Sequence, residues 1–254
     1  MRKLYQFLNK VGVSAVMLLG TFTLVSNPAI RSAGHNFLNL SSSDGSIANA
    51  AQVKQYVPPS DRTRPQRTEG SGSRGCTNSI PISLKLLTPN DHIARTVSAR
   101  PTFFWYISDT TNVPIAFSLI EPGTTQPIFQ QQLKADKAGI MKAELPPNVP
   151  ELAVGREYRW TVALVCSEKR PSENIYARAW IERMAISPEL SQKLGTANTD
   201  RDRAIIYAQS GIWQDAVATL YKAHTANPGE TQALNSLNTL LAQVGLTQIA
   251  TSDR

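Results

Sequence analysis

The strongest pattern along the chain is an alternation of apolar and polar residues between Ile80 and Ile186. A period of two is typical of half-buried β-strands, and turn-forming residues separate the apolar runs at short intervals. Seven such runs with no long helical pattern among them favour an immunoglobulin-like antiparallel β-sandwich over residues 76–186. The predicted strands cover residues 80–87, 102–107, 115–120, 128–133, 140–145, 158–166 and 175–184.

Two of these strands carry additional information. In the strand at 158–166, Tyr158, Trp160, Val162, Leu164 and Cys166 fall on one face, which predicts that this face points into the core. The strand at 102–107 is apolar on both faces. It therefore suits a central strand that is covered on both sides, or a strand whose outer face meets a second domain.

From residue 187 to residue 254 the apolar spacing changes to that of helices, and this predicts a separate helical subdomain. Pro188 suits the first turn of a short helix over residues 188–194. Thr199 or Asp200 can cap the next helix, which ends near Gln209. Amphipathic helices over 212–226 and 230–244 follow, and Gly245 ends the last of them.

The second and third predicted helices, which meet at Gly211, have the spacing of a tetratricopeptide-like hairpin. Gly211 provides the tight turn, small alanines lie where two helices approach closely, and Pro228 directs the exit. Fewer than three repeats form only a small concave surface for peptides, so a helical cap packed on the sandwich is an equal alternative. The positions that carry the match are Tyr207, Gly211, Trp213, Ala216, Ala223 and Pro228.

The N-terminal part of the chain predicts export. Arg2, Lys3 and Lys10 precede a short apolar run, which is the pattern of a secretory signal peptide within residues 1–33, with an uncleaved anchor as the alternative. The cleavage site stays open. Residues 34–75 are rich in Arg, Ser, Pro and Gly and have little to bury, which predicts a disordered linker. No later stretch is apolar enough to span a membrane, so the mature chain is expected to have no membrane span.

Charge and cysteine usage narrow the possible functions. The net charge is +7, but residues 1–75 carry +6 of it, residues 76–186 carry +2 and residues 187–254 carry −1. A basic pI of this origin does not indicate nucleic-acid binding. The chain has two cysteines, Cys76 and Cys166, which can form a disulfide outside the cytoplasm, two buried thiols being the alternative.

The sequence shows no constellation typical of an enzyme. His35, His92 and His224 are not at metal-ligand spacing, and no nucleophile elbow or phosphate-binding loop is present. We therefore predict no catalytic residues, no cofactor and no metal. A pair of carboxylates that cleaves a glycoside is a less favoured alternative. The acids available for it are Glu144, Glu151, Glu157, Glu173 and Glu182.

The last predicted strand carries the candidate binding strip, in which Tyr176, Arg178, Trp180 and Glu182 share one face. An outward Tyr and Trp beside Arg and Glu can stack on a sugar ring or anchor a protein partner. In the alternative interpretation, Trp180 packs under the C-terminal helices as the joint between the two parts.

Several short motifs together resemble the cyanobacterial domain-of-unknown-function 928 (DUF928) family over residues 70–245. The resemblance implies an exported cyanobacterial protein and carries no catalytic residues. The segment after Cys76 departs from the family pattern. The motifs are residues 100–106 (RPTFFWY), 155–160 (GREYRW), 164–166 (LVC), 180–183 (WIER) and 211–216 (GIWQDA).

The favoured hypothesis from the sequence is an exported, non-enzymatic protein of the periplasm or extracellular space that acts through protein–protein contact. In this hypothesis the sandwich is a rigid platform and the helical hairpin is the docking element. The alternative is a module that binds carbohydrate or a cell-wall polymer through the aromatic strip. The expected partner is thus an envelope protein or a wall polymer.

Overall fold

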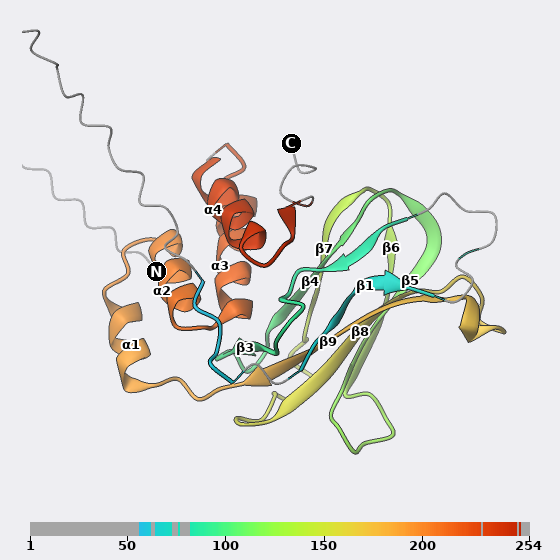
Figure 1. Cartoon of the computed structure of the whole chain (residues 1–254), viewed down its shortest axis with the longest axis horizontal. Helices are drawn as coiled ribbons and strands as arrows, with labels where there is room; N and C mark the ends of the chain where they lie inside the picture. Colours follow the sequence, from blue (N-terminus) through green and yellow to red (C-terminus); the bar gives the residue numbers. More distant parts are fainter. Residues whose placement is uncertain are drawn as a thin grey trace, which may run out of the picture. The chain divides into compact units, whose positions relative to one another are not determined.

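The computed structural model describes residues 56–61, 64–72, 76, 82–229, 231–247 and 249. The predicted signal peptide at 1–33 and much of the predicted linker lie outside these residues. Figure 1 shows the strands on one side and the helices on the other. The strands in the described part of the chain are β1 (Arg67–Ser71), β2 (Leu84–Leu86), β3 (Ala94–Thr96), β4 (Thr102–Ile107), β5 (Thr111–Ile120), β6 (Phe129–Ala135), β7 (Gly139–Glu144), β8 (Glu157–Leu164) and β9 (Ile175–Arg183). The helices are the short η1 (Pro171–Glu173), α1 (Pro188–Gly195), α2 (Asp200–Gln209), α3 (Trp213–Ala226) and α4 (Thr231–Ala242).

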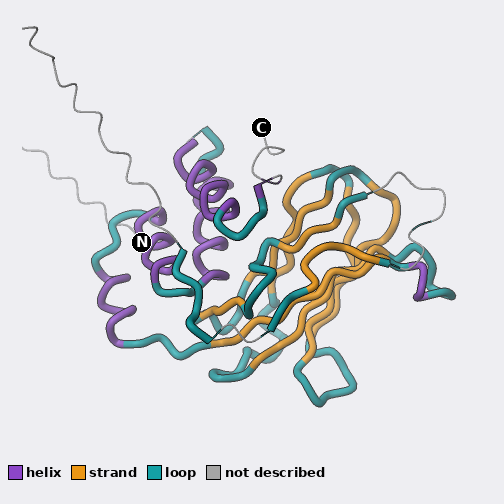
Figure 2. Tube along the Cα trace, in the orientation of Figure 1, coloured by secondary structure: helices purple, strands orange, loops and turns teal. Residues whose placement is uncertain are grey.

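The strands form one sheet rather than the two separate sheets of the predicted immunoglobulin-like sandwich. The order of hydrogen-bonded neighbours is β6-β5-β8-β9-β1-β2-β4-β7, and β3 pairs with β9 in parallel. The other pairs are antiparallel. The sheet curves into a nearly closed, barrel-like form (Figure 2). The sandwich prediction is therefore not confirmed, because strand alternation reports the buried face of each strand and not which strands are neighbours.

Strand β1 makes the sheet continuous, and it lies inside the segment predicted to be a disordered linker. It pairs with β9 through Arg67 and with β2 through Glu69. Gly70 permits this close approach: a Cβ there would lie 2.9 Å from Ile175 Cγ2 and 2.9 Å from Leu84 Cβ. The prediction of disorder is wrong for residues 67–71, because a segment with little to bury can still be ordered by backbone hydrogen bonds to neighbouring strands.

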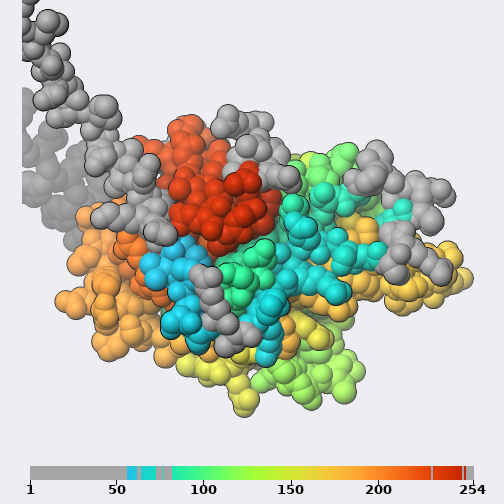
Figure 3. All heavy atoms as spheres, viewed as in Figure 1, coloured from blue at the N-terminus to red at the C-terminus, as the bar shows by residue number. Residues whose placement is uncertain are grey.

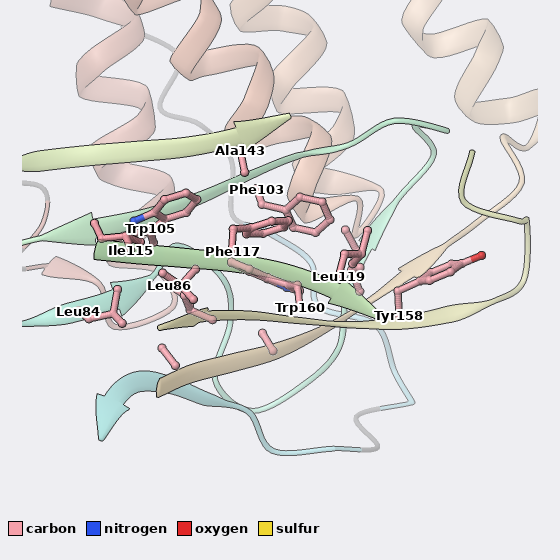
Figure 4. Close-up of a cluster of buried hydrophobic side chains, with 14 of the residues drawn as sticks. Leu84, Leu86, Phe103, Trp105, Ile115, Phe117, Leu119, Ala143, Tyr158 and Trp160 are labelled. Carbon is pink, nitrogen blue, oxygen red and sulfur yellow. The ribbon is translucent and has the colours of Figure 1, made fainter. Parts of the chain in front are cut away.

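The main hydrophobic core lies inside the curved sheet. Figure 4 shows the rings of Phe103, Phe117 and Trp160 meeting from β4, β5 and β8. The ring centroid of Phe103 lies 5.1 Å from that of Phe117 and 5.1 Å from that of Trp160, and both pairs have the tilted geometry that aromatic contacts favour. The inward face predicted for the strand at 158–166 is confirmed, since Tyr158, Trp160, Val162 and Leu164 are all buried.

The second core joins the helices to the outer face of β4. Phe104 points away from the interior of the sheet, is 2% exposed, and its ring lies 4.9 Å from that of Tyr221 on α3. Trp213, at the start of α3, is fully buried and donates from Nε1 to the Leu87 carbonyl at 3.0 Å. The strand at 102–107 is therefore covered on both sides, as its two apolar faces predicted, and the helices cover its outer face. A separate helical subdomain stays a prediction.

The predicted helices are present with bounds within two residues of the predicted ones. Thr199 caps α2 through its side chain, which accepts from the Asp202 backbone N–H as part of a capping box. Gly211 has φ +73°, which a residue with a Cβ rarely adopts, and it makes the turn between α2 and α3. Among the other hairpin positions, Ala216 is buried, Tyr207 and Ala223 are half-buried, and Pro228 is exposed beyond the end of α3. The tetratricopeptide-like identity of the hairpin stays a prediction.

Residues 56–61, the upstream segment, lie against the helices, where Figure 3 shows their blue atoms beside orange and red helical ones. Tyr56 is 3% exposed, its ring lies 4.9 Å from Trp213, and its hydroxyl is 2.7 Å from Nε2 of buried His92. The Val57 N–H donates to the Ala208 carbonyl at 3.1 Å. The upstream segment therefore covers one side of the α2–α3 hairpin.

The predicted disulfide between Cys76 and Cys166 is present, with a Cα–Cα distance of 5.1 Å. It closes a loop whose ends are 90 positions apart in the sequence. Replacing both cysteines by serine is expected to lower the free energy of unfolding by about 4–5 kcal/mol, because the unfolded chain regains loop entropy. Urea unfolding of the two proteins measures this difference. An unchanged unfolding midpoint would contradict it.

We also expect Gly70→Ala to lower the free energy of unfolding by about 1–3 kcal/mol, because the added methyl group overlaps β2 and β9. Gly195→Ala is the matched control. A Cβ at Gly195, the last residue of α1, would have no neighbour within 4 Å, so that change should leave stability equal or slightly higher. Thermal and urea unfolding of both variants test this. A Gly70→Ala protein as stable as the Gly195→Ala protein would show that β1 does not require the close approach.

Candidate functional site

The candidate strip on β9 has the predicted common face. Ala177, Ala179 and Ile181 are fully buried, whereas the alternate positions 176, 178, 180 and 182 are half-buried or exposed. The four strip residues therefore share the outer surface of the sheet. The two ends of the strip have different environments.

The Trp180 end of the strip is covered by Arg64 and Gln66, which precede strand β1. The guanidinium of Arg64 lies 4.2 Å from the centre of the Trp180 ring, and the backbone N–H of Trp180 donates to Gln66 Oε1 at 2.7 Å. Glu182 accepts from Nε of Arg95 on β3 at 3.0 Å. Trp180 is thus half-buried beneath Arg64, and it is absent from the described helix–sheet core. This end acts as a structural contact of the upstream chain.

The Tyr176 end of the strip opens into a cavity of about 340 Å³, which we call the outer trough. The trough crosses the outer face of β6, β5, β8 and β9, which are neighbours in the sheet. Its lining contains no charged side chain. The lining residues are Ala116, Phe117, Ser118, Gln130, Gln131, Gln132, Thr161, Ala163, Val165, Asn174 and Tyr176.

Cross-strand register explains the form of the trough. In one row, Ala116 is paired with Gln132 on one side and Ala163 on the other, and Ala163 is paired with Tyr176. Small side chains in the middle of the row and larger ones at its ends leave a depression. In the next row, Ser118 is paired with Gln130 and with Thr161. These paired positions place hydroxyl and amide groups beside the alanine floor.

The Tyr176 side chain is fixed at the edge of the outer trough. Its hydroxyl donates to the Pro171 carbonyl at 3.2 Å and accepts from Nδ2 of Asn174 at 3.3 Å. Asn174 is itself oriented by the Ser167 N–H, which donates to Oδ1 at 3.0 Å. The guanidinium of Arg178 lies 5.0 Å from the Tyr176 ring centre. A ligand would thus meet a preorganised ring and amide, which lowers the entropy lost on binding.

Each carboxylate proposed for glycoside cleavage has a cationic neighbour. Glu157 and Glu182 are cross-strand partners of β8 and β9, so the structure brings two of these acids together. Each is paired with its own arginine, which favours an ion-pair role over the acid–base pair of a glycosidase. The closest N–O distances are Glu144–Lys142 2.6 Å, Glu151–Arg100 3.8 Å, Glu157–Arg64 3.2 Å, Glu173–Arg170 2.8 Å and Glu182–Arg95 3.0 Å.

A smaller cavity, of about 120 Å³, lies between the chain after β3 and helices α2 and α3. Asp215 lies in it, and its Oδ2 accepts from the Val97 N–H at 3.2 Å. Burial raises the pKa of Asp215 to about 6, although hydrogen bonds from Thr96 and Val97 oppose the rise. Burial and the nearby Asp215 charge also raise the pKa of Tyr207. We interpret this cavity as a polar joint that ties α3 to the sheet.

Among the described residues, no group of three or more His, Cys, Asp or Glu side chains is arranged to hold a metal ion. Of the histidines discussed above, His92 is buried with Tyr56 and Asp91, and His224 is half-buried near the end of α3. No helix within the described ranges has the length and apolar character needed to cross a membrane.

Sequence reasoning identified Tyr176 but missed the rest of the outer trough. The sequence pattern did indicate part of the trough, because Ala116 and Ser118 alternate with the buried positions of β5 and so lie on its other face. Which strands lie beside β5 cannot be derived from that pattern. The grouping of Ser118 with Gln130 and Thr161 therefore depended on the register.

A family model described as Domain of Unknown Function (DUF928) matches residues 69–254. No curated protein matches this sequence. Among solved structures, the crystal structure of a multi-domain immunophilin from Arabidopsis thaliana matches with 9% sequence identity and a TM-score of 0.17. That alignment covers 78% of this chain and 97% of the immunophilin chain. A TM-score this low does not establish a common fold.

The raised pKa of Asp215 predicts a pH-dependent stability. Between the unfolded pKa near 3.8 and the folded pKa of about 6, the folded protein binds more protons than the unfolded chain. The contribution of Asp215 is therefore most favourable below about pH 4 and is lost as the pH rises through 6. The free energy of unfolding of the Asp215→Asn protein minus that of wild type should therefore increase by about 2–3 kcal/mol as the pH rises from 4 to 7.5. Urea unfolding across this range measures the difference, and a difference independent of pH would contradict the assignment.

Proposed function

This chain belongs to the DUF928 family by its match over residues 69–254, and we propose that it is an exported, non-enzymatic protein that binds a polysaccharide in the outer trough. The cyanobacterial source implied by the resemblance and the tetratricopeptide-like identity of the α2–α3 hairpin belong to the same proposal. The Cys76–Cys166 disulfide supports export, because such bonds persist in oxidising compartments.

The observation that carries the proposal is the chemistry of the outer trough. Its polar lining consists of amides and hydroxyls, such as those of Gln130, Ser118, Thr161 and Asn174, without any charged side chain. Sugar hydroxyls both donate and accept hydrogen bonds, and these groups can satisfy both roles. The Tyr176 ring adds an apolar face at the edge, where the C–H groups of a sugar ring can pack. A volume of about 340 Å³ falls in the usual range for small-ligand sites.

Docking of a protein partner on the helical hairpin has less support than sugar binding. The apolar face of α3 packs on Phe104 and Leu87, and Tyr56 of the upstream segment adds to the same core. Gly211 is also approached by this segment, since a Cβ there would lie 3.1 Å from the Val57 carbonyl oxygen. These contacts bury the apolar surface of the hairpin that a protein partner would need to bind. We therefore interpret the hairpin as a cap on the sheet.

A substitution that fills the outer trough tests the proposal. Ala116→Tyr should place a ring over the alanine floor without disturbing the strand, since aromatic residues suit half-buried strand positions. We expect the wild-type protein to bind one or more polysaccharides in an array of algal, plant and bacterial wall polymers. We expect the Ala116→Tyr protein to bind them at least about 10-fold more weakly, a loss of about 1.4 kcal/mol.

Lys134→Tyr is the matched control, because Lys134 lies on the outer face of β6 but outside the trough. It should keep wild-type affinity to within about twofold, which corresponds to about 0.4 kcal/mol. Circular dichroism and thermal unfolding establish that both variants are folded. Sugar binding in the trough is wrong if the wild-type protein binds nothing in the array, or if both variants bind as well as wild type.

A further inference from the structure

Three exposed arginines lie beside the outer trough on the same face of the sheet. Arg67 on β1 and Arg178 on β9 are direct cross-strand partners. Arg178 is in turn paired with Thr161 on β8, and Arg159 is two residues before Thr161, so it shares the outer face. We call Arg67, Arg159 and Arg178 the arginine patch.

The arginine patch has no acidic partner among the described residues. The nearest acids on the same strands are already used: Glu69 pairs with Lys85 at 3.0 Å, Glu157 with Arg64 at 3.2 Å, and Glu182 with Arg95 at 3.0 Å. Like charges directly opposite on neighbouring strands are destabilising. The fold therefore places repelling charges together, which is the arrangement expected where a bound anion neutralises them.

The patch is continuous with the trough. Thr161 lines the trough and is the cross-strand partner of Arg178, and the Arg178 guanidinium lies 5.0 Å from the centre of the Tyr176 ring. A chain molecule that fills the trough would thus extend over the arginines. Guanidinium groups form paired hydrogen bonds with carboxylates, which matches the acidic groups of uronic acid units.

We propose that the ligand of the outer trough is an acidic polysaccharide, whose neutral ring surfaces lie in the trough and whose carboxylates bind the arginine patch. This inference rests on the proposed function and assigns the chemical class of the ligand. A membrane surface is disfavoured, because lipid-binding basic clusters are larger and Glu157 and Glu182 lie on the same face. Nucleic acid is disfavoured because residues 67–186, which contain the whole patch, carry a net charge of only +3.

The test compares sugars that carry carboxylates with matched neutral sugars of the same backbone. The probes are polygalacturonate with its methyl ester, and cellulose oligomers with the same oligomers oxidised to carboxylates at their primary alcohols. We expect the wild-type protein to bind the acidic member of at least one pair about 10-fold or more tightly at low salt, with affinity that falls as salt rises. The double variant Arg67→Gln/Arg159→Gln leaves the contact between Arg178 and the Tyr176 ring in place. It should lose this preference to within about threefold while keeping its affinity for the neutral member.

The control Lys134→Gln/Lys137→Gln removes the same charge from exposed positions outside the patch and should keep the preference. The arginine variant should also unfold at the same or a higher temperature than wild type, because repulsion between β1 and β9 is relieved. This second measurement separates lost binding from lost folding.

The outcomes distinguish this inference from the proposed function. If neutral sugars bind in a trough-dependent way but the acidic members gain nothing, or lose nothing in the arginine variant, the trough binds sugar and the acidic assignment is overturned. Stronger arginine-dependent binding to vesicles of anionic phospholipid, or to dextran sulfate, than to either carboxylated sugar would also overturn it. Failure of every sugar to bind removes both proposals.

Discussion

Strand β4 is buried on both faces, and this double burial decides where the remaining surface is free. Phe103 and Trp105 are fully buried in the interior of the curved sheet, while Phe104 between them is buried against α3. A strand of this kind exposes large aromatic surface unless helices cover it, and each buried ring contributes roughly 2–3 kcal/mol. The helices therefore lie on the β4 side, and their apolar surface is used there together with that of Tyr56.

The face that the helices do not cover belongs to β5, β8 and β9, and it carries both the outer trough and the arginine patch. Side chains there are not needed for a core, so they can remain polar without a cost in buried apolar area. The repulsion between Arg67 and Arg178 lowers the stability of the fold, and no described contact of these two side chains with an acidic residue offsets it. Features that cost stability in this way are typical of functional surfaces. The two cores thus stabilise the fold, and the side chains of the outer trough and the arginine patch are left for ligand binding.

Local pattern was sufficient for the long elements. The alternation in β8 and the capping residues of α2 determined these elements and their buried faces, because both signals depend on neighbours in the sequence. Strands β1 and β3 could not be predicted in this way. They have five and three residues, and they are ordered by hydrogen bonds to β9, which is more than 75 residues away. The same bonds join the strands into one sheet in place of the expected sandwich.

The sequence by itself determined the longer strands, the helices, and the common face of Tyr176 and Arg178 on β9, and it left Cys76 with Cys166 as the one possible cysteine pair. Each of these follows from residue type and a short-range period. Only the tertiary structure decided that Arg64 covers Trp180 and that Ser118 and Thr161 lie beside Tyr176. It also decided that Arg67 faces Arg178. The physical reason is that strand register is set by the packing of the whole sheet, and no periodic pattern within one strand contains its neighbour's position.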